Sequence, residues 1–227
     1  MMKWEKKGVI YCPNGSVEWQ NQFAMLPTPY LKDENTLRIF LGFCDDKMVG
    51  RVGYVDVNPE NPSEVISISS SPVLDIGEDG CFDDNGVVIN SLIKKDGKIY
   101  LYYAGFQIGV KAPYYMFSGL AISDDNGETF QRHSKAPILD RNNEELHTRC
   151  GGFVIKDGNK YKMWYIASAK EGWRDNKETG KTEPLYQIRY VESDNGIDWS
   201  PKEGRICFEF ANEDEHGFGR PYVIKED

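Results

Sequence analysis

The sequence predicts an all-β fold of the β-propeller type, because one pattern of short strands returns about every sixty residues. In its clearest copy, the apolar segment 87–93 is followed by a turn at 95–98 and by the aromatic segment 99–103. The same order returns at 151–165, and Gly219–Asp227 resembles the start of a further copy. No segment has convincing helical periodicity, and the polar residues 171–183 are expected to form a long loop.

Further strands complete each copy. Third strands are predicted at 51–56, 118–122 and 186–191, and fourth strands at 65–68, 130–138 and 199–208. The sequence therefore divides into three complete four-stranded blades at about 13–75, 76–140 and 141–208, followed by the start of a fourth at 209–227.

The N-terminal segment 1–12 resembles the fourth-strand segments. In a propeller, such a strand joins the last blade and closes the ring, which removes exposed sheet edges. We therefore expect a truncated chain, lacking about one and a half blades of a five-bladed ring. The alternative is a complete small protein whose open edge strands pair with a second copy.

The composition excludes several classes of partner. A net charge of −9 offers no basic stripe for nucleic acid. The five cysteines include no close pair, and the sequence contains neither a signal peptide nor a membrane-spanning apolar run. These features predict a cytoplasmic protein without disulfides, metal or cofactor. The 13% of aromatic residues suits β-sheet packing or stacking on sugars.

Residues Ser123, Asp125, Gly127 and Phe130 resemble the Asp box of sialidases and other propellers. Asp194, Gly196 and Trp199 repeat three of the four positions, while the expected serine position holds Glu192. Such a motif builds a hairpin turn, in which the carboxylate accepts backbone N–H groups and glycine takes a positive φ. We expect a structural role for it, remote from substrate.

Longer motifs resemble a family of carbohydrate-active proteins. They are Gly80-x-Phe82-Asp83-Asp84-x-Gly86-Val87, the apolar-Lys-Asp-Gly strands, and the segment from Tyr186 to Trp199. These look like five-bladed propellers of the superfamily that contains arabinanases, β-xylosidases, invertase-type fructosidases and mannoside phosphorylases. The resemblance covers essentially all 227 residues and is closest to uncharacterised members, which often occur with surface-polysaccharide genes.

The resemblance implies a ligand at one end of the central channel, contacted by residues at the start of each innermost strand. Asp84 and Asp83 match the acidic position of the second blade and are the expected catalytic residues. The expected substrate-binding or anion-binding residues are Trp19, Gln22, His147, Arg149, Trp173, Glu215, His216 and Arg220.

The implied function is a glycoside hydrolase-like or phosphorylase-like enzyme acting on a glycosidic or sugar-phosphate bond. Hydrolysis requires a second carboxylate, yet residues 21–30 contain none, and His147 to Arg149 stand where a general-acid Glu is expected. A propeller that binds a glycan or sugar phosphate without catalysis is therefore the main alternative, and a scaffold is the third. Locally, Asp83 and Asp84 could form a turn, the two histidines could be structural, or His and Asp could hold a metal.

Overall fold

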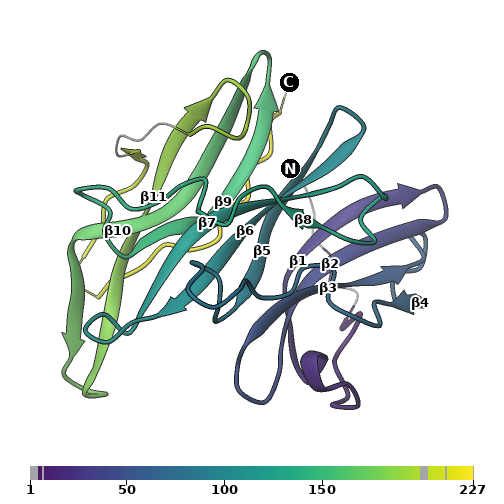
Figure 1. Cartoon of the computed structure of the whole chain (residues 1–227), viewed down its shortest axis with the longest axis horizontal. Helices are drawn as coiled ribbons and strands as arrows, with labels where there is room; N and C mark the ends of the chain where they lie inside the picture. Colours follow the sequence, from purple (N-terminus) through teal and green to yellow (C-terminus); the bar gives the residue numbers. More distant parts are fainter. Residues whose placement is uncertain (1–4, 7, 200–203, 213, 227) are drawn as a thin grey trace.

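The structure is a computed structural model that describes residues 5–6, 8–199, 204–212 and 214–226 (Figure 1). In this part the chain forms β-strands and one 3-10 helix, η1 (Glu18–Gln20), without an α-helix. The predicted all-β class is therefore confirmed. No helix among the described residues is long and apolar enough to cross a membrane.

The strands form three successive antiparallel meanders, which lie from right to left in Figure 1. The first contains β1 (Gln22–Asp33), β2 (Thr36–Cys44), β3 (Gly50–Val57) and β4 (Val65–Ile68). The second contains β5 (Val87–Lys95), β6 (Lys98–Ile108), β7 (Tyr114–Ser123) and β8 (Gln131–Arg132). The third contains β9 (Thr148–Asp157), β10 (Lys160–Asn176), β11 (Lys181–Ser193) and β12 (Arg205–Ile206).

Apolar and aromatic side chains join the faces of adjacent meanders. Phe40 and Val52 of the first meander share one buried cluster with Val87 and Tyr103 of the second. A second cluster joins the second and third meanders and includes Tyr102, Leu120, Met163, Tyr165 and Trp199. Face-to-face packing of this kind places the first strand of each meander nearest to a common centre.

The inner strands β1, β5 and β9 are neighbours around that centre, since β5 contacts both of the others. The Ser91 hydroxyl of β5 donates to the Gly152 carbonyl of β9 at 2.8 Å and accepts from the Val154 N–H at 3.2 Å. β7 pairs in parallel with β9 through Met116 and Thr148. The beginnings of β5 and β9 therefore lie at one end of the molecule, called here the strand-start end.

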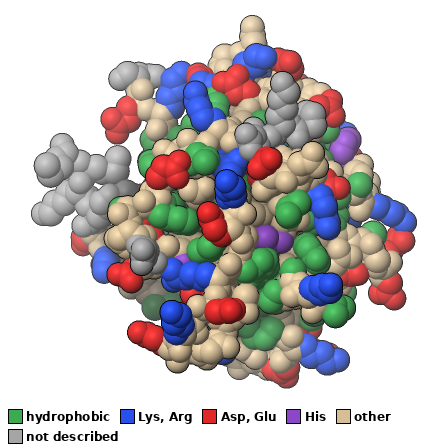
Figure 2. Space-filling view, turned by 90° about the vertical axis from the view of Figure 1, so that its left-hand side faces the viewer, with side chains coloured by type: hydrophobic (Ala, Val, Ile, Leu, Met, Phe, Trp, Pro, Cys, Tyr) green, Lys and Arg blue, Asp and Glu red, His purple; other side chains and the backbone are tan. Residues whose placement is uncertain are grey.

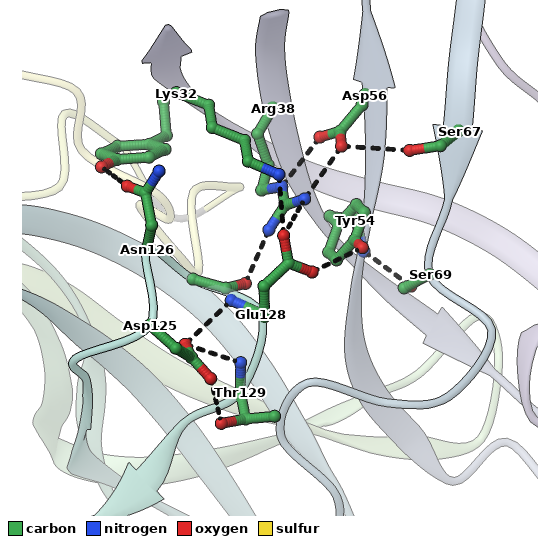
Figure 3. Close-up of polar contacts among 12 residues, drawn as sticks. Lys32, Arg38, Tyr54, Asp56, Ser67, Ser69, Asp125, Asn126, Glu128 and Thr129 are labelled. Carbon is green, nitrogen blue, oxygen red and sulfur yellow. Dashed lines mark hydrogen bonds and ion pairs between the residues drawn. The ribbon is translucent and has the colours of Figure 1, made fainter.

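The motif that resembles an Asp box forms a tight turn after β7 (Figure 3). The Asp125 carboxylate accepts from the Ser123 hydroxyl, the Thr129 hydroxyl and two backbone N–H groups, and Gly127 has a φ of +83°. In the third meander Ser193 and Asn195 make the corresponding contacts. Ser193, and not the residue at position 192, therefore corresponds to Ser123. The second turn is one residue shorter between its serine and its glycine.

One expectation about a loop is wrong, and the N-terminal ring-closing strand stays a prediction. Residues 171–183 do not form a loop but extend the β10–β11 hairpin, in which Arg174 opposes Glu183 in a 3.3 Å ion pair. Cross-strand pairing holds this polar ribbon together without an apolar face. Within the predicted N-terminal strand, the described residues 5–6 and 8–12 have no strand assignment. Instead, Tyr11 packs edge-on against Phe43; the remainder of that segment lies outside the described residues.

Among its described residues, the predicted start of a further blade makes one isolated bridge, between Gly217 and Tyr186 of β11, and its last part runs beside β9 without pairing in a sheet. Tyr222 contacts Phe153, with ring centroids 4.6 Å apart, and Lys225 forms a 2.7 Å ion pair with Asp157. Of the predicted fourth strands, 65–68 is found as β4, whereas only short parts of the other two pair within the described residues. The five-bladed ring and the blade boundaries stay predictions.

Candidate functional site

A small cavity lies between the inner strands, close to the strand-start end. Its volume is 160 Å³. Its wall is mostly apolar and includes Leu26, Val88, Ala104, Phe106, Met116 and Ile166. Asn90 of β5 and Arg220, which precedes Pro221, add polar side chains. We call this space the channel cavity.

Arg220 links the C-terminal segment to β1. Its Nη2 donates to the Pro27 carbonyl of β1 at 2.8 Å, and its backbone has a φ of +47°. Burial lowers the pKa of Arg220. Its Nη1 is buried and has no hydrogen-bond partner among the described residues. Arg220 is therefore the predicted anion-binding residue that lines the cavity.

The two predicted catalytic carboxylates have different surroundings. Asp83 is fully buried, and its Oδ2 accepts from Arg132 Nε at 2.8 Å and from the Tyr103 hydroxyl at 3.0 Å. Asp84 is half-buried in the turn before β5, where its Oδ2 accepts from the Gly80 N–H at 2.9 Å. Its Oδ1 is buried and lacks a hydrogen-bond partner within the described chain. The Oδ1 atom of Asp83 is also buried without a described partner, so the two acids differ in their ion pairs: Asp83 pairs with Arg132, and Asp84 has no ion pair among the described residues.

Arg149 does not extend toward the cavity. Its guanidinium forms an ion pair with Glu145, and both side chains are buried. Glu145 also accepts from the Tyr165 hydroxyl at 2.9 Å and pairs with Arg189 at 3.2 Å. Glu145 is thus shared between two arginines inside the third meander, and the anion-binding role of Arg149 stays a prediction.

His147 and Trp173 lie together at the strand-start end. Their ring centroids are 4.5 Å apart, and Trp173 also packs edge-on against Tyr114 at 5.5 Å. His147 Nε2 is 2.9 Å from the Gly172 carbonyl, and Nδ1 is 2.9 Å from the Thr148 hydroxyl. Since a carbonyl can only accept, Nε2 carries the proton of the neutral ring. Both ring nitrogens are thus engaged within the protein.

The other predicted binding residues are more scattered. Trp19 packs edge-on against Phe43 at 5.6 Å, and Gln22 is the first residue of β1. Glu215 accepts from the Ala211 N–H within a turn. His216 lies close enough to Glu183 to help lower the pKa of that carboxyl, after the hydrogen bonds from Asn176 and Arg174. Their binding roles stay predictions.

Sequence reasoning missed Asn90. Its Nδ2 donates to the Ile89 carbonyl at 3.2 Å, while its Oδ1 is buried without a hydrogen-bond partner among described residues. A polar amide within the apolar segment 87–93, where Ser91 is the other polar residue, is the signal that could have found it. Within the described part of the chain, no group of three or more His, Cys, Asp or Glu residues could hold a metal ion.

Comparison with known proteins gives the family. No family model matches the sequence. An uncharacterised protein of Mycobacterium tuberculosis, Rv1502, is 31% identical over 225 residues, covering 99% of this chain and 73% of that protein. The chain belongs to the Rv1502 family. Its counterpart in a second strain of the same organism, MT1551, matches to the same extent.

Solved structures identify the fold of this Rv1502 family member. A BT0996–RGII complex has a TM-score of 0.71 at 16% identity, covering 96% of this chain and 66% of the BT0996 chain. A glycoside hydrolase has a TM-score of 0.71 at 16% identity, covering 97% and 67%. Zg3597 of Zobellia galactanivorans, a family 117 glycoside hydrolase, has a TM-score of 0.62 at 16% identity, covering 90% and 53%. The expected resemblance to glycoside hydrolases is confirmed at the level of the fold.

Proposed function

We propose that this chain binds a carbohydrate at the strand-start end and cleaves a glycosidic bond there, with Asp84 as the proton-transferring carboxylate. The observation that carries the proposal is the contrast between the two adjacent acids. Asp83 is paired with Arg132 and accepts from the Tyr103 hydroxyl. Asp84 accepts only from the Gly80 N–H and has no ion pair among the described residues. The Oδ1 atom of each residue is buried without a described partner, so the two acids differ in their charged neighbour. Glycosidic cleavage needs such a group to protonate the leaving oxygen.

The fold supports this proposal, because solved proteins of the same fold include glycoside hydrolases. A fold hosts many functions, so the residues at the site must carry the assignment. The attacking group can be water or inorganic phosphate. The aromatic surface of Trp173 and Tyr114 offers a face on which a sugar ring can stack.

The test is turnover of a panel of 4-nitrophenyl glycosides, with and without inorganic phosphate. We expect Asp84→Asn to reduce turnover about 10²–10⁴-fold, the usual contribution of a general acid or base. Asp79→Asn, an exposed acid just before the same turn, is the matched control and should retain turnover. Circular dichroism should show both variants folded. Full turnover by Asp84→Asn would refute the assignment, and a requirement for phosphate would identify phosphorolysis.

A binding protein without catalysis is the second candidate. It is favoured by the ion pairs of Asp83 with Arg132 and of Glu145 with Arg149, which occupy two acids near the inner strands. A two-carboxylate mechanism requires a second carboxylate within reach. This candidate predicts saturable binding of a glycan by calorimetry, with no product from any glycoside in the panel.

A further inference from the structure

The channel cavity contains two buried polar atoms with complementary chemistry. Arg220 Nη1 is a cationic donor and Asn90 Oδ1 is an acceptor, and neither has a hydrogen-bond partner among the described residues. The opposite ends of both side chains are held, Arg220 Nη2 by the Pro27 carbonyl and Asn90 Nδ2 by the Ile89 carbonyl. Buried polar groups in folded proteins are normally paired. A ligand with both an acceptor and a donor would pair them.

The charge in the cavity selects the acceptor. Arg220 is the single charged residue among those that line the cavity in the described structure. An anionic oxygen would both accept from Nη1 and neutralise the guanidinium, as carboxylates do in charge-assisted pairs. The lowered pKa of Arg220, caused by burial, agrees with a cation that the surrounding protein does not neutralise.

Asn90 selects the rest of the ligand. Its Oδ1 needs a donor, which an ionised carboxylate lacks and a hydroxyl supplies. The remaining wall is apolar and suits C–H groups. The volume of 160 Å³ is several times the ~30 Å³ that one water occupies in the liquid. The ligand therefore combines an anionic oxygen, a hydroxyl and a small carbon frame.

We propose that the channel cavity is a subsite for an acidic sugar, whose carboxylate binds Arg220 and whose neighbouring hydroxyl donates to Asn90. This inference rests on the proposed function and specifies its substrate class. The surface on the left-hand side of Figure 1 offers no comparable basic centre, since acidic and basic side chains are interspersed over its described part (Figure 2).

The test is isothermal calorimetry with galacturonate and glucuronate against galactose, glucose and inorganic phosphate. We expect a uronate to bind at least 10-fold more tightly than its neutral parent and than phosphate. Arg220→Gln and Asn90→Leu should each weaken uronate binding about 10-fold or more. Arg205→Gln is the matched control, because Arg205 is exposed on β12. Thermal melting without ligand shows whether each variant is folded. If Arg220→Gln is unfolded, Asn90→Leu still tests the subsite.

Three outcomes would overturn the subsite. They are equal affinity for uronate and neutral sugar, phosphate binding as tight as uronate binding, and no binding of any probe, which would leave a cavity that holds solvent. The proposed function fails separately. Asp84-dependent turnover of neutral glycosides without uronate binding would reject the subsite alone, whereas uronate binding without turnover of any glycoside would reject catalysis alone.

Discussion

Arg38 and Asp56 form a doubly hydrogen-bonded ion pair between β2 and β3, with Nε–Oδ1 and Nη2–Oδ2 distances of 2.8 Å (Figure 3). The Arg38 side chain is fully buried. The same guanidinium donates to the Gly127 carbonyl at 3.0 Å and to Glu128 at 2.9 Å. These two residues belong to the turn after β7, so a single arginine joins the first meander to the second.

Removing the charge of Asp56 should therefore destabilise the whole protein. We expect Asp56→Asn to lower the free energy of unfolding by about 3 kcal/mol, because a buried arginine loses its main counter-ion. Urea unfolding followed by tryptophan fluorescence measures the change. Asp124→Asn, an exposed acid in the neighbouring turn, should leave the midpoint within error. An unchanged midpoint for Asp56→Asn would show that Glu128 alone neutralises Arg38.

Because of the turn that contains Asp125 and Glu128, the stability of the protein should depend on pH in the acidic range. Burial would raise the pKa of both carboxyls, but hydrogen bonds from Thr129 and Ser123 lower that of Asp125 to about 2. Bonds from Lys32, Arg38 and Tyr54 likewise lower that of Glu128 to about 2. The ordinary values are 3.8 and 4.5, so the unfolded chain takes up protons first as the pH falls.

Their contribution to stability is therefore complete above about pH 4.5 and is lost between there and pH 2. The melting temperature should fall as the pH is lowered through this range. The melting temperature of Glu128→Gln should fall less steeply. Glu34→Gln, at the exposed β1–β2 turn, should retain the wild-type slope. A Glu128→Gln profile parallel to the wild type would contradict the assignment.

Strand order could be predicted from the sequence because alternation and turn residues act locally. The segment 65–68 and the start of β5 at Val87 agree with the structure. The β10–β11 ribbon was missed because its residues are polar and gain their order from pairing across the hairpin. The turn of the third meander was aligned one residue too early with the turn at Asp125. There Asn195 takes the role of the aspartate, and Ser193 takes the role of the serine one position after Glu192.

The candidate site was less predictable, because neighbouring residues of the same type acquire opposite environments. Asp83 and Asp84 are chemically alike in the sequence, yet one is paired with Arg132 and the other is not. Arg149 was expected to bind an anion, and nothing in the sequence indicated that Glu145 in the preceding loop forms an ion pair with it. Which side chain forms an ion pair depends on the direction in which it points at a bend in the chain. The spacing of residues in the sequence does not determine that direction.

Gly119 on β7 lies against the ring of Tyr103, whose hydroxyl holds Asp83. A Cβ at position 119 would lie 2.2 Å from Tyr103 Cζ. We expect Gly119→Ala to cost about 1–3 kcal/mol of stability, since the ring must move inside a packed core. Gly219→Ala is the control, because its nearest contact is an ordinary 3.9 Å. Chemical denaturation of both variants tests this, and equal midpoints would show that the ring relocates freely.

The buried imidazole of His147 should titrate abnormally. Burial lowers its pKa below the ordinary value of 6.5, and the hydrogen bond to the Gly172 carbonyl offsets part of that effect. The ring is therefore neutral at pH 7. It remains neutral at lower pH values at which a histidine in the unfolded chain is already protonated. Because the unfolded chain binds the proton more readily, stability conferred by this site is complete above pH 6.5 and is lost as the pH falls below it.

Nuclear magnetic resonance titration of the histidine ring protons measures this pKa directly. We expect the His147 signals to move only below pH 6.5. Protonation would place a cation against the Trp173 ring, 4.5 Å away, and force the Thr148 hydroxyl to stop donating to Nδ1. His147→Gln should therefore remove the part of the loss of melting temperature that begins below pH 6.5, whereas His133→Gln, at an exposed position, should keep it. A slope that survives in His147→Gln would mean that another group takes up the proton.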